Sequence, residues 1–230
     1  MILPGTTKDG RPRISYSQLN SWTSKSAFRG INIGGQEVTQ SGKHGYILER
    51  MVGYEYPPDP SKESFAPFGD KVEDAICEQD FSGFTDREAN VLKSIKPLGV
   101  FQKPVEIDFG DFVLTGFIDD CNKTPTKLRD YKTASVNSAK KYYTDEYKQL
   151  EIYALERYKR TGKLPTSLEV CVIERIGNPF RGEELKVGEN VWYIEREISK
   201  QILDDVEEWV VENTREIAEY YETFLKMNIK

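Results

Sequence analysis

Cysteine and histidine are scarce in this sequence, and long apolar runs are missing. The chain has one histidine, His44, and three widely spaced cysteines, Cys77, Cys121 and Cys171. An odd, scattered set of cysteines forms neither a disulfide framework nor a CxxC metal site. With no His or Cys near it, His44 is expected to be an exposed bystander and not a metal ligand. These absences argue against a zinc site and against a thiol nucleophile.

Targeting and nucleotide-binding signals are also missing from the sequence. No apolar run approaches the roughly 18 residues that a membrane span needs. Residues 1–13 lack the apolar segment of a secretory signal. The segment 42–45, Gly-Lys-His-Gly, lacks the spacing of a P-loop. We therefore expect a cytoplasmic protein with no membrane partner.

Charged residues are abundant, and acidic ones outnumber basic ones. The chain has 38 Asp and Glu against 32 Lys and Arg, a net charge of −6, while 38% of its residues are hydrophobic. This composition permits a real core. Net acidity argues only weakly against a nucleic-acid partner, because binding follows the local field and because carboxylates that hold a metal no longer repel phosphate.

The first hundred residues are predicted to be mainly helical. Two capping boxes, Ser15 with Gln18 and Thr85 with Glu88, mark helix starts. Apolar residues at helical spacing predict further helices over 46–52 and 68–76. Residues 29–45 are rich in Gly and polar side chains and are expected to form a loop.

After residue 100 the pattern changes to alternation, which is typical of strands. Residues 105–109 alternate, 112–118 are nearly all apolar, and Gly110-Asp111 supplies the turn between two strands. The further expected elements are a strand over 127–133, a helix over 143–158, strands over 168–176 and 191–198, and an amphipathic helix from 200 onward. This order predicts an α/β fold with a central mixed β-sheet flanked by helices.

Chain length favours a single domain over residues 1–230. Within it we distinguish a helical N-terminal part over 1–100, a sheet-and-helix part over 101–198 that carries the chemistry, and a C-terminal helix over 199–230.

The sharpest chemical signal is a carboxylate at the end of one strand, followed by a carboxylate and an amine on the next. Asp119 ends an apolar strand, and Asp130 and Lys132 are two apart on a strand, so they share a face. If the two strands pair, the three groups converge. Converging carboxylates suit Mg²⁺ or Mn²⁺, and the backbone carbonyl of Tyr131 is a further candidate ligand. The alternative is ordinary: a turn at Asp119 and a solvated strand edge at Asp130.

Three further patterns accompany this pair of strands. Gln149 and Tyr153 are four apart and share a helical face, Gly69 and Glu73 have the same spacing, and an SxSxL sequence begins at Ser15. The ordered set SxSxL, GxxxE, GxxD, DxK and QxxxY resembles the RecB-type branch of the PD-(D/E)XK nuclease superfamily, especially its phage and recombination exonucleases. The resemblance covers 15–153, about two-thirds of the chain, and implies a restriction-endonuclease-like core.

The resemblance also implies roles for single residues. Glu73 would be the helical carboxylate at the metal site, and Asp119 and Asp130 the strand ligands. Lys132 would be the catalytic lysine. Gln149 and Tyr153 would lie beside the site, contacting DNA or holding the lysine strand. Some relatives carry four cysteines for an iron–sulfur cluster; this chain has three, so no cluster is expected.

The implied activity is Mg²⁺- or Mn²⁺-dependent hydrolysis of DNA, by an exonuclease serving recombination, repair or phage DNA processing. A recombination or replication protein is a possible partner, and a phage-encoded chain would act in the bacterial host cytoplasm. A structure-specific endonuclease, an idle DNA-binding module and a generic α/β protein are the competing hypotheses.

Basic and aromatic residues also interleave over 140–160. Lysines and arginines alternate here with Tyr142, Tyr143 and Tyr147. The segment could follow a DNA strand through phosphate contacts and stacking. A solvated helix face with tyrosines half in the core explains the pattern equally well.

We predict that Glu73, and not Glu49, serves the active site, although both end a GxxxE sequence. Glu73→Gln should lower DNA cleavage by orders of magnitude, because it removes a carboxylate charge beside the proposed metal. Glu49→Gln is the matched control and should change the rate little. The reverse result in a Mg²⁺ cleavage assay would show that the wrong helix was chosen.

Overall fold

A computed structural model describes residues 5–24, 30–33, 36–39, 42–55, 60–144 and 147–228. The chain forms two compact units. The first unit comprises Met1–Pro57, Val105–Gly116 and Asp204–Lys230, and the second comprises Pro58–Pro104 and Phe117–Leu203. The single domain expected from chain length stays a prediction. Among the described residues, no helix is both long and apolar enough to span a membrane.

Six strands form one mixed sheet. They hydrogen-bond in the order β1-β5-β6-β7-β8, with β4 also paired to β5. β6 and β7 run parallel, whereas β5 with β6 and β7 with β8 run antiparallel. The strands are β1 (Arg13–Ser15), β4 (Val100–Asp108), β5 (Val113–Cys121), β6 (Lys127–Ala134), β7 (Ser167–Ile176) and β8 (Lys186–Arg196). The prediction of an α/β fold with a mixed sheet flanked by helices is confirmed.

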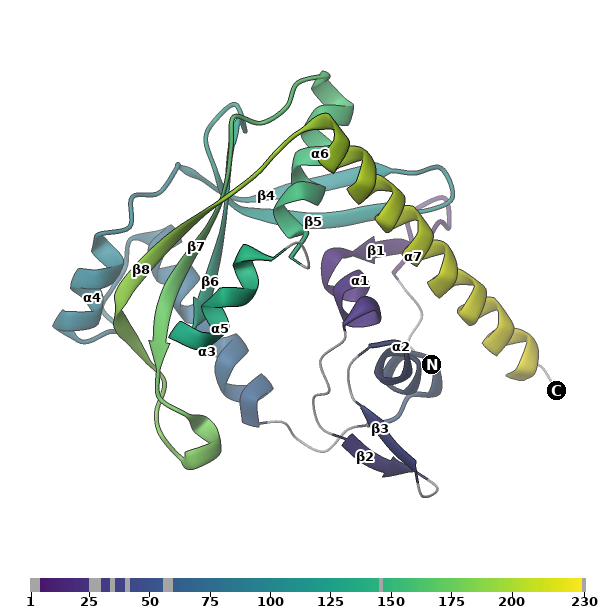
Figure 1. Ribbon diagram of the computed structural model, residues 1–230, viewed down its shortest axis with the longest axis horizontal. Helices are drawn as coiled ribbons and strands as arrows, with labels where there is room; N and C mark the ends of the chain where they lie inside the picture. The colour runs from purple at the N-terminus through teal and green to yellow at the C-terminus, as the bar shows by residue number, and fades with distance from the viewer. Residues whose placement is uncertain are drawn as a thin grey trace. The chain divides into compact units, whose positions relative to one another are not determined.

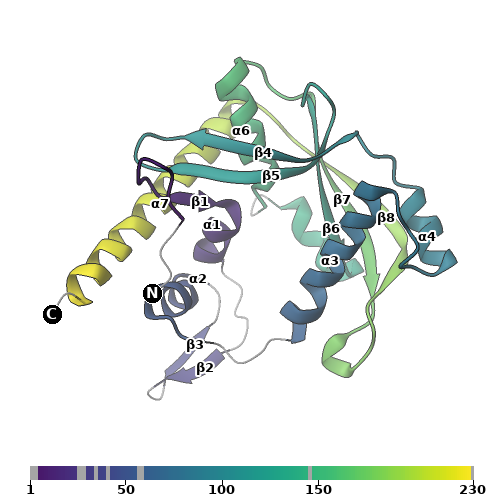
Figure 2. The same cartoon turned by 180° about the vertical axis from the view of Figure 1, so that it is seen from behind.

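In the second unit, helices cover both faces of the strands β6, β7 and β8 (Figures 1 and 2). Helix α3 (Pro60–Glu78) packs on β6 and α4 (Asp86–Lys93) packs on β8, both on the face that Figure 2 turns toward the viewer. Helix α6 (Gln149–Thr161) packs on β6 and β7 from the other side. Two short turns, α5 (Val136–Ala139) and η2 (Lys140–Tyr143), connect β6 to α6.

The core beneath α3 and α4 follows from the spacing of their apolar residues. Val72 and Ile76, one helical turn apart, are buried against Tyr131 and Ile173 of the sheet. Alternation along β6 and β7 therefore assigns the odd-numbered residues near Tyr131 and Ile173 to this face. Asp130 and Lys132 occupy the alternate positions, and Lys132 also reaches the α3 side, where it lines a cavity with Gly69 and Glu73.

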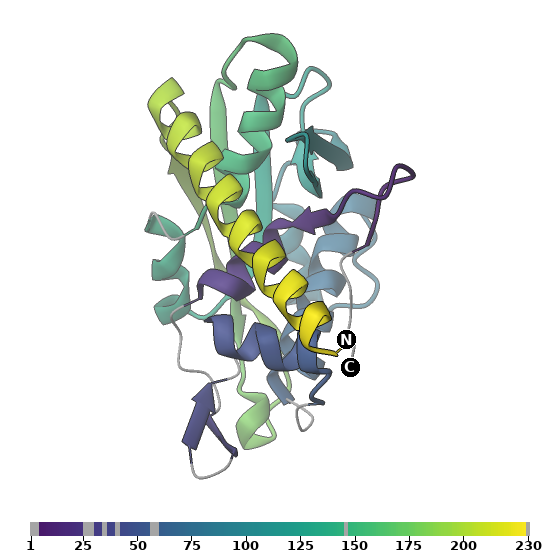
Figure 3. The same cartoon turned by 90° about the vertical axis from the view of Figure 1, so that its right-hand side faces the viewer.

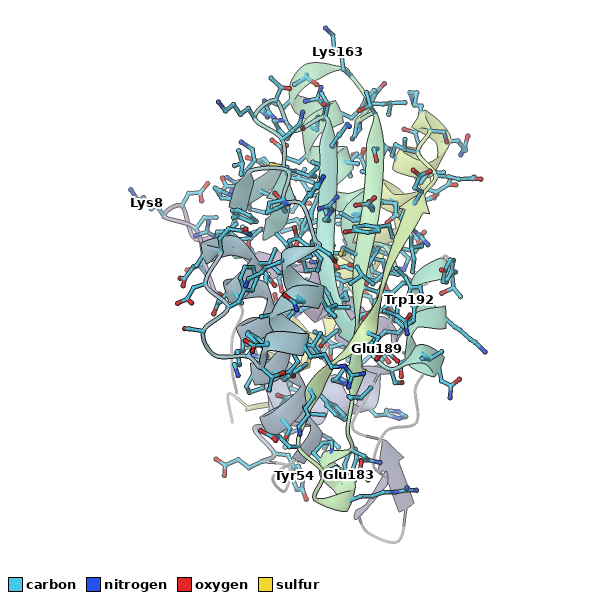
Figure 4. All side chains as sticks on the ribbon, turned by 90° about the vertical axis from the view of Figure 1, so that its left-hand side faces the viewer. Lys8, Tyr54, Lys163, Glu183, Glu189 and Trp192 are labelled. Carbon is cyan, nitrogen blue, oxygen red and sulfur yellow. The ribbon has the colours of Figure 1, made fainter. Side chains whose placement is uncertain are left out.

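The β7–β8 hairpin carries the short helix η3 (Pro179–Arg181) in its loop. Figure 4 shows Glu183 at the tip of this hairpin, and Lys163 at the opposite end of the same strands. The loop beyond α6 that holds Lys163 begins at Gly162, whose φ of 67° ends that helix in a left-handed cap.

The first unit contains two antiparallel strands, β2 (Gly30–Ile33) and β3 (Gln36–Thr39), and several helices. Helix α7 (Lys200–Asn228), most of which belongs to this unit, lies along α1 (Tyr16–Thr23) and α2 (Gly42–Tyr46), as Figure 3 shows. Trp22 explains the packing: its ring meets Tyr46 and Tyr220 edge-on, and its indole N–H donates to Glu216 at 2.9 Å.

Most expected elements are confirmed, including both capping boxes. The loop expected over 29–45 is wrong in its described parts, because 30–33 and 36–39 are strands and 42–46 is helical. The helix over 46–52 is confirmed from Ile47 to Val52, as the π-helix η1. The helix expected from residue 143 begins six residues later, at Gln149.

Arg196 binds the described backbone that precedes α6. Its guanidinium donates to the backbone carbonyls of Tyr142, Thr144 and Tyr147, all at 2.9–3.0 Å. It also pairs with Glu151 at 2.8 Å, and the two side chains are only 9% and 5% exposed. A residue fifty positions downstream thus satisfies carbonyls that a continuous helix would have used internally.

We predict that Arg196→Ala lowers the free energy of unfolding by about 3–5 kcal/mol, because it leaves a buried carboxylate and three carbonyls without their donor. Urea denaturation followed by circular dichroism measures the change. Arg160→Ala is the control: its pair with Glu156 is a surface pair within α6, with the arginine 52% exposed. That variant should lose only about 0.5 kcal/mol. Equal losses in the two variants would contradict the assignment.

Candidate active site

The site begins where strands β5 and β6 separate. The two strands pair at Asp120 with Arg129 and at Cys121 with Leu128, next to Asp119 and Asp130. Next to these pairs, the Asp119 side chain takes the place of a backbone acceptor: its Oδ2 accepts the backbone N–H of Tyr131 at 2.9 Å. The residue is 8% exposed. The sequence prediction that the two strands pair is therefore confirmed, and a side chain closes the gap beside them.

Asp130 and Lys132 lie next to this gap on β6. The Lys132 ammonium donates to Asp130 Oδ1 at 2.6 Å and lies 3.9 Å from Asp119 Oδ2. It also donates to the backbone carbonyl of Tyr131 at 3.1 Å. The DxK sequence and the upstream Asp119 thus converge as predicted, and the Tyr131 carbonyl is on the lysine's side of the site. The solvated strand edge is wrong for Asp130, which is 1% exposed.

The charges of this site are unbalanced. Burial, and next the negative charge of Asp130, raise the pKa of Asp119 well above its usual range, while Lys132 acts in the opposite direction. Burial disfavours the charge on Lys132, but Asp130 and Asp119 outweigh burial and raise the pKa of the ammonium. Asp130 Oδ2 is buried without a hydrogen-bond partner. Two carboxylates therefore share one lysine, and one of their oxygens is left unsatisfied.

Glu73 approaches from α3 and is held by an amide. The Gln102 side chain of β4 donates from Nε2 to Glu73 Oε1. Gln102 has a φ of 46°, a conformation that is rare outside glycine and that marks it as a specially placed residue. Burial raises the pKa of Glu73, Lys132 lowers it, and Asp130 raises it again, so Glu73 shares the field of the carboxylate site.

Gln149 and Tyr153 form a hydrogen-bonded ladder along the start of α6. Tyr147 Oη donates to Gln149 Oε1 at 3.2 Å, and Gln149 Nε2 donates to Tyr153 Oη at 3.2 Å. Burial, with the charges of Asp119 and Asp130, raises the pKa of Tyr153 to about 12, although the bond from Gln149 lowers it. The shared face predicted for these two residues is confirmed, and Tyr153 lies within the electrostatic reach of the carboxylates.

A divalent cation with oxygen ligands fits this donor set. Asp119 and Asp130 supply buried carboxylate oxygens, one of them without a partner, and the Tyr131 carbonyl lies beside them. Within the described ranges, no three His, Cys, Asp or Glu side chains gather closely enough to enclose an ion by themselves. Mg²⁺ is commonly bound through one or two carboxylates with water and substrate phosphate completing its shell, so a pair of carboxylates suffices. Direct ligation by Glu73 stays a prediction.

Asp120 and Arg129 also carry charge near the site, and no sequence pattern assigned them a role. Asp120 is fully buried and accepts the N–H groups of Leu98 and Gly99 and the hydroxyl of Tyr131, at 2.7–3.0 Å. Arg129 pairs with Glu169 at 2.6 Å. The hydrogen-bonding groups of Asp120 are thus occupied and fix the strand ends, whereas Asp119 and Asp130 share one lysine and Asp130 Oδ2 has no hydrogen-bond partner. The sequence signal that could have identified Asp120 is its place directly after Asp119 in an apolar strand.

The basic and aromatic segment over 140–160 was expected either to contact DNA or to be a solvated helix face with tyrosines in the core, and its described residues match each alternative in part. Tyr142 and Tyr147 are buried and pack edge to face at 5.2 Å, as the core interpretation expects. Arg157 donates to a backbone carbonyl and Arg160 pairs with Glu156. Tyr143, by contrast, is 64% exposed. His44 is exposed, as predicted.

Comparisons with known proteins give little beyond the fold. No family model matches the chain, and no curated protein matches its sequence. A crystal structure of a putative exonuclease from Eubacterium rectale aligns over 91% of this chain and 85% of that one, with a TM-score of 0.46 and 13% identical residues. A functional assignment therefore depends on the site and not on this likeness.

We predict that Asp119→Asn stabilises the metal-free protein. The amide oxygen keeps the acceptor for Tyr131, while the repulsion with Asp130 disappears. In EDTA at pH 7 the thermal midpoint should rise by about 2–4 °C, or ~1 kcal/mol for a chain of this size.

Asp119→Ala is the matched control for this prediction. It removes the same charge but leaves the Tyr131 N–H without an acceptor, so it should be less stable than Asp119→Asn by about 1–3 kcal/mol. A midpoint for Asp119→Asn below that of the unmodified protein would contradict the repulsion.

Proposed function

We propose that this protein is a metal-dependent nuclease that hydrolyses phosphodiester bonds in DNA, acting as an exonuclease. The observation that carries the proposal is the single lysine between two buried carboxylates: Lys132 Nζ lies 2.6 Å from Asp130 and 3.9 Å from Asp119. Such an excess of buried negative charge costs folding free energy, so a chain retains it where a bound cation gives it a use.

Each residue of the site has a role that its surroundings support. Asp119 and Asp130 would hold the cation, together with the Tyr131 carbonyl and, through its placement by Gln102, Glu73. Lys132 stays protonated near neutral pH, because its carboxylate neighbours raise its pKa. Its ammonium can therefore orient an attacking water and meet the negative charge that develops on the phosphoryl group. Tyr153 and Gln149 would support the carboxylates from α6.

The expected ion is Mg²⁺ or Mn²⁺, which when bound polarises phosphoryl oxygens and lowers the pKa of water. Oxygen donors and the scarcity of cysteine and histidine in the sequence favour these hard ions over zinc. The three cysteines, none of them paired, give no basis for an iron–sulfur cluster.

The order of the motifs supports the nuclease class, because each lies on an element of the expected kind. SxSxL starts helix α1, GxxxE lies in α3, GxxD and DxK lie on strands β5 and β6, and QxxxY starts α6. This arrangement resembles the RecB-type nucleases. An endonuclease acting on particular DNA structures is the alternative on the same site, and recombination, repair and phage DNA processing are the proposed settings.

The test is cleavage of end-labelled linear DNA in Mg²⁺, Mn²⁺ or EDTA, with a closed circular DNA of the same sequence beside it. We expect cleavage of the linear DNA in either metal and none in EDTA. Release of mononucleotides from ends alone supports the exonuclease, and cutting of the circle supports the endonuclease. Binding of DNA without cleavage in either metal would leave an idle module and overturn the proposal.

Lys132→Ala should lower the cleavage rate by about 10²–10³, because it removes the group that meets charge in the transition state. DNA affinity in Ca²⁺ should fall only slightly, since one positive charge is lost among many contacts. Lys140→Ala is the control, a change of the same charge at an exposed position of η2. It should cleave at the unmodified rate. Full activity in Lys132→Ala would remove the DxK sequence from the mechanism.

A further inference from the structure

A cavity of about 310 Å³ opens beside the carboxylate site in the second unit. It is lined from helix α3 and from strands β6 and β7, and it shares Glu73 and Lys132 with the site. The lining residues that the site does not use include Phe65, Gly69 and Arg175. Gly69 has no side chain to fill this space, and its nearest neighbour across the cavity is Thr133.

Arg175 is the unexplained charge in this cavity. Its guanidinium stacks over the Phe65 ring, 3.7 Å from the centroid, and the residue is half-buried. Within the described residues it has neither a carboxylate nor a hydrogen-bond acceptor, whereas Arg129 and Arg196 each bind a glutamate. Burial lowers the pKa of Arg175 for lack of such a partner. A half-buried guanidinium without an anion has the character of a binding group.

The β7–β8 pairing is irregular next to Arg175. The register shifts between Ile173 and Arg175, so that Arg175 pairs with Val187. Glu174 holds the shift from the other face of β7, where its carboxylate accepts the backbone N–H groups of Glu189 and Asn190 at 2.9 and 3.1 Å. Bulges of this kind commonly re-aim a side chain beside an active site.

An exposed aromatic ring adjoins the same cavity. Phe180, in the β7–β8 loop, is 52% exposed and meets Phe65 edge-on, with ring centroids 6.1 Å apart. The Phe65 ring, over which the Arg175 guanidinium lies, is thus in contact with the Phe180 ring, which faces solvent. A base can stack on the exposed ring while its phosphate reaches the guanidinium, which is the pairing that single strands of nucleic acid offer.

We propose that Arg175 binds a phosphate of the nucleic-acid strand other than the one that is cleaved, with Phe180 stacking the neighbouring base. The anion would lie against the Arg175 guanidinium, in a lining that also carries the Lys132 ammonium and the carboxylates of Asp70 and Glu73. This subsite rests on the proposed nuclease function and gives it a substrate preference, a strand that is unpaired at the cavity. The phosphate is either an internal diester or a terminal monoester.

The test measures the affinity of a fluorescent ten-nucleotide oligothymidine, with and without a 5′-phosphate, in Ca²⁺ over a range of salt concentrations. Arg175→Gln should weaken binding about tenfold, because it removes a charge-assisted bond to phosphate. It should also reduce the slope of log affinity against log salt by about 0.7, the value for one phosphate contact on a single strand. Arg175→Lys should restore the slope.

Arg181→Gln is the control, an exposed arginine of the same hairpin that does not line the cavity. It should leave affinity and slope unchanged. A loss in Arg175→Gln confined to the phosphorylated oligonucleotide identifies a terminal phosphate, and a loss with both identifies an internal one; either supports the subsite. Circular dichroism of each variant checks the fold, and Phe180→Ala, at an exposed position, provides a second variant that should weaken binding about tenfold.

Wild-type affinity and slope in Arg175→Gln, or an equal loss in Arg181→Gln, would overturn the subsite. These results are independent of cleavage. If the unmodified protein fails to cleave DNA in Mg²⁺ or Mn²⁺ while the Arg175 effects hold, the nuclease proposal fails and the phosphate subsite stands. If it cleaves and the Arg175 effects are missing, only the subsite fails.

Discussion

The bond from the Tyr131 backbone to the Asp119 carboxylate is the constraint on which the site depends. Strands β5 and β6 pair only at the Asp120 end, and beyond it the side chain of Asp119 satisfies the N–H that a partner strand would have taken. The opening that results admits groups from α3 and β4 as well as from the sheet itself. The same carboxylate therefore completes the fold and belongs to the proposed metal site, and its hydrogen bond to the backbone fixes its position.

Charge balance distinguishes Asp119 and Asp130 from the other buried acids of the described structure. Asp120 has three donors, and Glu151 has one buried arginine to itself, although its Oε2 is buried without a hydrogen-bond partner. Asp119 and Asp130 share Lys132 and retain an oxygen without a partner. The same contrast holds for arginines, since Arg175 has no anion among the described residues where Arg129 has one. Other described residues, among them Glu151 and Thr214, also bury an atom without a partner, so the feature that sets the proposed site apart is two buried carboxylates with one lysine.

Sequence patterns within a few residues were enough to predict those helices and strands that are set by capping and by alternating burial. The capping boxes at Ser15 and Thr85 and the alternation around Val105 gave correct helices and strands because turn chemistry and burial act within a few residues. Spacing also brought Asp130 and Lys132 together. The start of α6 could not be found this way: the carbonyls before Gln149 are held by Arg196, and no pattern near residue 143 contains that information. Arg175 was missed for a similar reason, since its lack of a partner becomes visible only after every neighbour is placed.

The cap on Tyr131 also restricts how this site can change in evolution. Under the proposed nuclease function, a chain that abandoned cleavage but kept the fold would gain by losing the charge at position 119, yet it would still need an acceptor for the Tyr131 N–H. Asparagine meets both demands, and alanine or a larger apolar residue meets only the first. Among descendants that have become binding proteins, position 119 should therefore drift to asparagine, while position 130, which caps no backbone group in the described structure, is open to a wider range of residues.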